Sequence, residues 1–337
     1  MSYGTTVVRR ISLFGVLTIF LGVAAGLLVV SQSQQTSYEF AAETQSVAET
    51  AIEPFPVGVD PDNATITEQV VIDDFYNEHL AQSDFQSNDD SWWSRVTAMF
   101  QTSNTFQMLA SPVSRIIVIW PGERTEELTE NIGEVLHWDA KERAAFSGYM
   151  NENTFGFKQG TVPPGQYITH HKASAEDIMM VMERTFTDSV SDRYTPEIEE
   201  TLPLSQALII ASLIEREASD FENMREISGV IWNRLFIDMP LQLDASLQYV
   251  KAENPYEKSW WPAVRPADKF IDSEFNTYQN SGLPPEPIAN PSVEAIVAAL
   301  NPVVTDCLFY FHSRSRDYYC SETYVEHKVK LGEVYGL

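Results

Sequence analysis

The sequence has few basic residues for its length. It contains 22 Lys and Arg against 48 Asp and Glu in 337 residues, which gives a formal net charge of −26 at pH 7. Proteins that bind DNA or RNA neutralise phosphates with basic patches, whereas a chain of this charge repels a polyanion. The composition therefore argues against a nucleic acid as the primary partner.

The usual signatures of metal and nucleotide sites are also missing. The 6 histidines do not form a spacing such as H-E-x-x-H, and the chain has neither a P-loop nor a G-x-G-x-x-G motif. We therefore expect no metal and no cofactor. Only 2 cysteines occur, so the chain is not a disulfide-dense scaffold.

What remains is an ordinary globular composition. Hydrophobic residues make up 44% of the chain, aromatic residues 12% and charged residues 21%. A chain of 337 residues can bury a substantial core, which excludes disorder throughout and predicts one large or two modest domains.

The first long apolar run, residues 11–30, contains no charged side chain. A helix of this length spans about 30 Å, the hydrocarbon thickness of a bilayer, which predicts a retained single transmembrane helix. Arg9 and Arg10 precede the run, and no Lys or Arg follows before Arg95. The positive-inside rule then places residues 1–10 in the cytoplasm and the rest of the chain outside the cytoplasmic (inner) membrane.

The next segment, residues 31–94, is acidic and has no Lys or Arg. It is rich in Ser, Gln, Thr and Ala, and it contains Pro54, Pro56 and Pro61. Such a composition is typical of solvated chain, so we expect an acidic tether between the membrane and the folded part.

Strand and helix signals alternate after the tether. The run RIIVIW ends in the turn Pro121-Gly122 and precedes apolar residues at helical spacing, and Ser174 with Asp177 predicts a capped helix start. We expect a small membrane-proximal α/β module over residues 95–200, and a second mixed α/β domain over residues 201–337. The predicted fold class is therefore α+β.

The strongest helix signal of the soluble part covers residues 204–219. Its nearly continuous apolar run ends in Glu215 and Glu217. Burial at such a point raises the pKa of a carboxyl group towards the range that a general acid needs near neutral pH. Two positions that are two residues apart on a helix are rotated by about 200° around its axis, so the two side chains cannot both face one cleft. Periodicity does not choose between them, and composition alone also permits both to be solvated.

The residues after this helix predict the walls of a site. A second amphipathic helix over residues 223–238 comes first, and the proline-rich stretch 282–291 then predicts a rigid wall that positions ligands. A short helix over residues 292–300 follows. The segments CLFYF and YYCSETY predict a β-hairpin with an aromatic face.

These segments resemble, in order, the YceG-like endolytic transglycosylases (MltG family). The residues that carry the resemblance are Ala211-Ser212-Leu213-Ile214-Glu215-Arg216-Glu217, Ile231-Trp232-Asn233-Arg234-Leu235, Met239-Pro240-Leu241-Gln242-Leu243-Asp244, Asn276-Thr277-Tyr278, Gly282-Leu283-Pro284-Pro285, Pro287-Ile288-Ala289-Asn290-Pro291, Ala298-Ala299-Leu300-Asn301-Pro302 and Glu326-His327. The resemblance extends from about Trp120 to the C-terminus and is dense from Ala207 on. It also implies a LysM-like membrane-proximal module, although the residues before Ser114 carry no recognisable signature of one. The family usually has Gly where Ser292 stands.

The resemblance implies an enzyme that cleaves peptidoglycan glycan strands internally, between N-acetylmuramic acid and N-acetylglucosamine, without water. It implies that Glu217 is the catalytic acid, that Glu215 supports it, and that the product ends in a 1,6-anhydro sugar. The motif residues with amide, carboxylate or phenol groups are expected to bind substrate, each with a loop-fixing role as the alternative: Gln242, Asp244, Asn276 and Tyr278. For Asn233, inside a helix, capping or packing against the helix that carries Glu217 is favoured over substrate contact.

Three functions stay open at this point. The first is a lytic transglycosylase that works on nascent strands beside peptidoglycan synthases or division proteins. The second is a catalytically degenerate member that binds glycan or division proteins as a scaffold. The third is a hydrolase in which Asp244 positions a water molecule. Cys307 and Cys320 form either a disulfide across the hairpin or two separate buried thiols.

Overall fold

The computed structural model describes residues 52–69, 71–80, 113–151, 158–218 and 220–336. From Glu53 onward they belong to one compact unit of helices with three two-stranded antiparallel sheets in the described part. The expected mixed α/β character is confirmed. The expected tail, 1–10, and membrane span, 11–30, lie outside the described residues, as do 31–51 and 81–94 of the tether. No helix of the described part is long and apolar enough to cross a bilayer.

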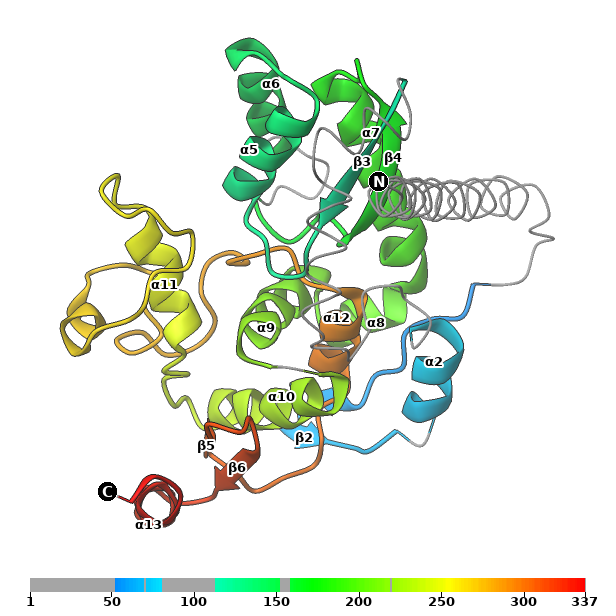
Figure 1. Cartoon of the computed structure of the whole chain (residues 1–337). Helices are drawn as coiled ribbons and strands as arrows, with labels where there is room; N and C mark the ends of the chain where they lie inside the picture. The colour runs from blue at the N-terminus through cyan, green and yellow to red at the C-terminus, as the bar shows by residue number, and fades with distance from the viewer. Residues whose placement is uncertain (1–51, 70, 81–112, 152–157, 219, 337) are drawn as a thin grey trace, which may run out of the picture. The chain divides into compact units, whose positions relative to one another are not determined.

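The elements follow one another along the chain in the order below, and Figure 1 labels most of them. They are β1 (Val59–Asp60), β2 (Thr65–Ile66), α2 (Ile72–His79), β3 (Ser114–Ile119), α5 (Thr125–Val135), α6 (Ala140–Asn151), β4 (Gly165–His170), α7 (Ala175–Ser189), η1 (Ser191–Arg193), α8 (Pro196–Thr201), α9 (Leu204–Glu217), α10 (Phe221–Phe236), α11 (Asp244–Ala252), η2 (Pro266–Phe270), α12 (Val293–Leu300), β5 (Phe309–His312), β6 (Tyr318–Ser321) and α13 (Tyr324–Tyr335).

The expected α/β module has its own hydrophobic core. Strands β3 and β4 pair antiparallel, from Ser114 opposite His170 to Ile119 opposite Gly165, and they pack with α5, α6 and the first half of α7. The predicted helix start is confirmed, because Ser174 and Asp177 form a reciprocal capping box. The order strand, helix, helix, strand is clear; a LysM-like identity for the module stays a prediction.

Helix α7 belongs to two cores, which places the change between them before residue 200. Ile178 and Met182 pack in the core of the module. Phe186 and Val190 pack in the second and larger core, together with Ile198 of α8. The segment after Met182 thus packs in the larger core, ahead of the expected boundary at residue 200.

The expected solvated tether is wrong for its described part. Phe55, Val59, Ile72 and Phe75 are each at most 3% exposed and belong to the larger core. The backbone is also tied down, because the amide of Gly58 donates to the carbonyl of Leu300 over 2.9 Å. Acidic composition concealed these widely spaced apolar residues, which together bury enough surface to order the segment.

Helix α9 is the centre of the larger core. Every residue from Ala207 to Ile214 is buried, and α10, α11 and α12 pack around the helix (Figure 1). The helix follows Pro203, and its first amide, of Leu204, donates to the Glu199 carboxylate over 2.9 Å. It ends at Glu217, because Ala218 is extended. The apolar run therefore holds both ends of α9 in fixed places.

The sequence predicted that the proline-rich stretch 282–291 forms a wall of the site. In the structure it does not line the cavity. Ile288, Ala289 and Asn290 are 0% exposed, and the Ile288 amide donates to the Ser212 hydroxyl of α9 over 3.0 Å. The Asn290 side chain accepts from the amide of Gly160 and donates to the carbonyl of Glu123. This stretch instead joins α9 to the α/β module, which satisfies the polar groups that its burial removes from water.

The aromatic hairpin is confirmed and is closed by a disulfide. Strands β5 and β6 pair from Phe309 opposite Ser321 to His312 opposite Tyr318. Cys307 and Cys320 are bonded, with their Cα atoms 5.7 Å apart, which decides between the two alternatives. The helices α11 and α13, on either side of the site described below, were not predicted.

The disulfide predicts a redox effect on stability. Replacing both Cys307 and Cys320 with serine removes a crosslink over a sequence separation of 13, which is expected to lower the free energy of unfolding by about 3 kcal/mol. Urea unfolding with and without dithiothreitol measures this loss. The reductant should shift the midpoint of the wild type alone; an unchanged wild-type midpoint would contradict the prediction.

Candidate active site

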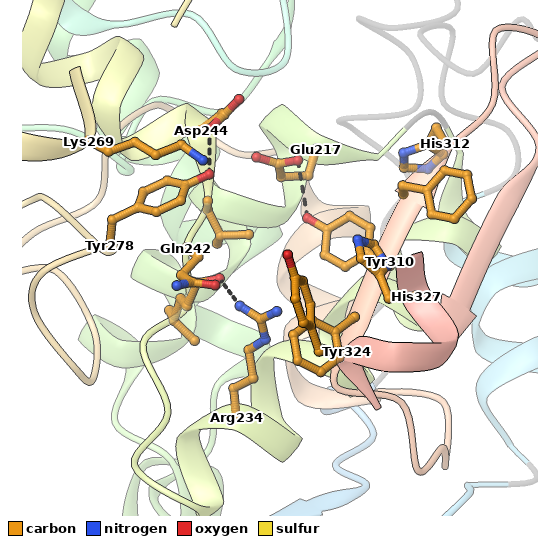
Figure 2. Close-up of a pocket in the computed structure, with 14 residues that line it drawn as sticks. Glu217, Arg234, Gln242, Asp244, Lys269, Tyr278, Tyr310, His312, Tyr324 and His327 are labelled. Carbon is orange, nitrogen blue, oxygen red and sulfur yellow. Dashed lines mark hydrogen bonds between the residues drawn. The ribbon is translucent and has the colours of Figure 1, made fainter. Parts of the chain in front are cut away.

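A cavity of about 370 Å³ lies at the C-terminal end of α9, within the size range of ligand sites. One side is formed by β5 and α13, and the other by the start of α11 with the loops that carry Lys269 and Tyr278 (Figure 2). The lining residues are Glu217, Arg234, Leu241, Gln242, Leu243, Asp244, Lys269, Tyr278, Phe309, Tyr310, Phe311, His312, Tyr324 and His327.

The carboxyl group of Glu217 is held between the two sides of this cavity. Its Oε2 accepts a hydrogen bond from the Tyr310 hydroxyl over 3.1 Å, and its Oε1 accepts one from the Ala245 amide over 3.4 Å. The residue keeps part of its surface exposed towards the cavity. Of the two glutamates at the end of α9, Glu217 is the one that lines this cavity.

The surroundings of Glu217 favour its protonated form. Burial raises the pKa of its carboxyl group, and the nearby carboxylate of Asp244 raises it further. The hydrogen bonds from Tyr310 and Ala245 act in the opposite direction and lower the pKa, but the net shift is upward. The negative end of the α9 dipole adds to the cost of a charge at this position. A carboxyl group in this environment is suited to donate a proton near neutral pH.

The hairpin is fixed against α10 so that Tyr310 reaches Glu217. Asn233 of α10 donates from Nδ2 to the carbonyls of Thr305 and Cys307, over 2.6 and 3.1 Å. Arg234 donates from Nε to the carbonyl of Leu308 over 2.6 Å. These bonds hold the chain leading into β5, so the Asn233 side chain is bound to the hairpin segment.

Asp244 and Tyr278 face Glu217 from the opposite side of the cavity. The Tyr278 hydroxyl donates to Asp244 over 2.7 Å, and Asp244 is exposed at the first position of α11 (Figure 2). Gln242 is also exposed, and its φ of 53° lies in a region that non-glycine residues seldom adopt. The backbone amide of Gln242 donates to the carbonyl of Thr277 over 2.9 Å, which holds this part of the backbone in place.

Asn276 does not line the cavity. It is 0% exposed, and its Nδ2 donates to the carbonyls of Lys269 and Ile271 while its Oδ1 accepts from the amide of Tyr278. The structure therefore places it as a loop-fixing residue, which was the alternative to substrate contact. It orients the loop that presents Lys269 and Tyr278 to the cavity.

The model of the YceG-like family matches residues 30–333. The chain belongs to the YceG-like family. This confirms the resemblance seen in its motifs.

Two curated relatives match this YceG-like chain over part of its sequence. It is 33% identical over 180 residues to an endolytic murein transglycosylase of Bacillus subtilis, over 53% of this chain and 48% of the relative. It is 32% identical over 152 residues to an endolytic murein transglycosylase of Streptococcus pneumoniae, over 45% of this chain and 27% of the relative. The chain thus spans about half the length of the first relative and about a quarter of the second.

A solved structure supports the family fold. The crystal structure of a YceG-like protein from Listeria monocytogenes superposes with a TM-score of 0.54 at 25% sequence identity. The match covers 64% of this chain and 75% of the Listeria chain.

Glu215 has a different environment from Glu217, as their spacing on α9 predicts. Its carboxylate accepts from both the amide and the hydroxyl of Ser292, over 2.8 and 2.5 Å, at the start of α12. It does not line the cavity. Burial raises its pKa to about 7, with a further contribution from Glu294, against the opposing effect of the Ser292 hydrogen bonds. Glu215 therefore joins α9 to α12, which is a supporting position.

Several residues of the cavity were missed as site residues by the sequence analysis. They are Arg234, Lys269, Tyr310, Tyr324 and His327. Arg234 and His327 stood in the motifs that carried the resemblance, and Tyr310 stood in the aromatic hairpin. No periodicity indicated that this hairpin would fold back against the end of α9.

The described residues contain one group with the spacing of a metal site, formed by Glu53, Glu78 and His79. His79 is 2.8 Å from Glu53, and none of the three residues lines the cavity. This group therefore has no role in the candidate active site.

The raised pKa of Glu215 predicts a pH-dependent stability. A carboxyl group whose folded pKa exceeds its unfolded pKa stabilises the fold fully below about 4.5, and this contribution is lost as the pH rises through about 7. Glu215→Gln should remove this loss, which amounts to about 3 kcal/mol.

Chemical denaturation at pH values between 4 and 8, a range that brackets the pKa values of 4.5 and about 7, measures how the free energy of unfolding changes with pH. Glu253→Gln, at an exposed position, is the control and should keep the wild-type slope. An equal slope in wild type and Glu215→Gln would contradict the burial of an ionisable Glu215.

Proposed function

We propose that this chain is a membrane-anchored endolytic lytic transglycosylase that cleaves peptidoglycan glycan strands between N-acetylmuramic acid and N-acetylglucosamine. The observation that carries the proposal is Glu217, whose carboxyl group faces the cavity with a raised pKa. Family membership and the names of the curated relatives support the same reaction.

The chemistry needs one carboxyl group that acts twice. The protonated Glu217 donates its proton to the glycosidic oxygen, the bond from that oxygen to the muramyl C1 breaks, and positive charge develops on the sugar. The 6-hydroxyl of the same muramyl residue then forms a bond to C1. Its proton passes to the carboxylate of Glu217, which restores the acid. The product end is a 1,6-anhydro sugar, and no water is consumed.

The surrounding groups suit the two states of Glu217. Tyr310 donates to the carboxyl group and stabilises the carboxylate that exists between the two proton transfers. Asp244 adds negative charge on the far side, which favours the protonated state and also the developing positive charge on the sugar. Gln242, Asp244 and Tyr278 are the proposed substrate contacts, since each lines the cavity.

The proposed location is the outer side of the cytoplasmic membrane. The apolar run 11–30 supports a single anchor, with residues 1–10 in the cytoplasm. The disulfide between Cys307 and Cys320 supports an oxidising, extracytoplasmic compartment for the folded part. Glycan strands, and the synthases that make them, are on that side.

Replacing Glu217 tests the reaction. The full chain in detergent micelles should convert uncrosslinked glycan strands into shorter strands with 1,6-anhydro ends, which mass spectrometry detects as products lighter than hydrolysed ends by one water. Glu217→Gln cannot donate a proton and should lower the rate by about 100-fold or more. Glu253→Gln should retain the wild-type rate.

The products separate the alternative functions. Reducing ends from the wild type would indicate a hydrolase and overturn the non-hydrolytic reaction. Equal rates for the wild type and Glu217→Gln would refute the assignment of the acid. A wild type that binds strands without shortening them would point to the glycan-binding scaffold.

Tyr310 gives a second prediction, on the pH dependence of the rate. Its hydrogen bond lowers the pKa of Glu217, so Tyr310→Phe should raise that pKa. Because the protonated acid is the reactive form, the alkaline limb of the profile of kcat/KM should move to higher pH.

The matched control is Tyr318→Phe on the neighbouring strand of the hairpin. Its ring stacks near Tyr310 with centroids 6.0 Å apart, and its buried hydroxyl has no hydrogen-bond partner among the residues that the structure describes. This variant should leave the limb in place. An alkaline limb in Tyr310→Phe that stays put or moves to lower pH would rule out the proposed effect.

A further inference from the structure

The cavity contains two carboxyl groups, of Glu217 and Asp244, and few available positive charges. Arg234 lines it, but its guanidinium is engaged by the carbonyls of Leu308, Pro240 and Leu241. His312 and His327 also line it, and burial lowers the pKa of both, which favours neutral imidazoles at neutral pH. Lys269 is the remaining basic residue among those that line the cavity.

The position of Lys269 is fixed by its backbone. It lies in η2, and its carbonyl accepts hydrogen bonds from Asn276 over 3.2 Å and from Gln279 over 2.9 Å. Its ammonium group lies 4.4 Å from the centroid of the Tyr278 ring, which is a cation–π contact (Figure 2). The loop therefore presents this ammonium group at the cavity.

No carboxylate of the described residues forms an ion pair with Lys269. The neighbouring Asp268 is paired with Lys251 over 2.8 Å and also accepts from the amide of Arg265 over 2.7 Å. The Tyr278 hydroxyl, beneath the lysine side chain, donates to Asp244. The Lys269 side chain is exposed, so a bound anion can reach its ammonium group.

The proposed reaction places a carboxylate near this point. Glu217 must lie at the bond from the muramyl C1, so a muramyl ring occupies the cavity. The same ring carries a lactyl ether whose carboxyl group is free in peptide-free strands. In peptide-bearing strands this group is an amide, and the stem peptide supplies carboxylates instead.

We propose that Lys269 determines specificity by binding a carboxylate carried by the muramyl residue at the cleaved bond, supplied by the lactyl group or by the stem peptide. This inference rests on the proposed transglycosylase function. In a chain with a net charge of −26, such a cation offsets the repulsion that an anionic strand otherwise meets at Asp244 and at the protein surface.

The test compares three kinds of strand: peptide-free strands, the same strands with their lactyl groups converted to neutral methylamides, and strands with intact stem peptides. The wild-type full chain should have a KM about fivefold lower for peptide-free strands than for methylamide strands. If peptide-bearing strands behave like peptide-free strands, the stem peptide also supplies the carboxylate; if they behave like methylamide strands, the lactyl group alone does.

The matched variants isolate the charge. Lys269→Met should abolish the difference in KM between peptide-free and methylamide strands, whereas Lys269→Arg should keep that difference. Lys258→Met, at an exposed position outside the cavity, should behave like the wild type. Added NaCl should shrink the difference in the wild type, because it screens an exposed ion pair.

The outcomes distinguish this inference from the proposed function. Cleavage by the wild type without discrimination between strands, or discrimination that survives in Lys269→Met, overturns the role of Lys269 and leaves the transglycosylase proposal intact. Failure of the wild type to cleave any of the three strands overturns the proposed function itself.

Discussion

The site depends on the burial of one carboxyl group at the end of a buried helix. Helix α9 is surrounded by α10, α11 and α12, which holds its last residue, Glu217, at the edge of the core. The cost of a charge there favours the protonated acid, and the Tyr310 and Ala245 hydrogen bonds keep the ionised form accessible. This balance is what a group that donates and then recovers a proton needs.

The same helix separates a structural acid from a reactive one. Glu215 and Glu217 both have raised pKa values, yet Glu215 is bound to Ser292 at the start of α12 while Glu217 faces the cavity. A raised pKa alone therefore does not identify the catalytic residue. The Ser292 hydroxyl gives Glu215 a second hydrogen bond, in addition to the one from the Ser292 amide.

Local patterns were sufficient for much of the fold, whereas the choice of Glu217 over Glu215 came from the resemblance to the family. The apolar run of α9, the Ser174 capping box and the aromatic hairpin each follow from near neighbours in sequence. The sequence could not show that Tyr310 reaches Glu217 across a separation of 93 residues, because such a contact depends on tertiary packing. For the same reason, the burial of Phe55 and of the proline-rich stretch was not predicted.

The central claim is that Glu217 has a raised pKa in the folded protein. Infrared difference spectroscopy of the carboxyl stretch during a pH titration, with Glu217→Gln to assign the band, measures it directly. The account predicts a protonated Glu217 that titrates above the ordinary value of 4.5. A Glu217 that is already ionised at or below that value would contradict the account.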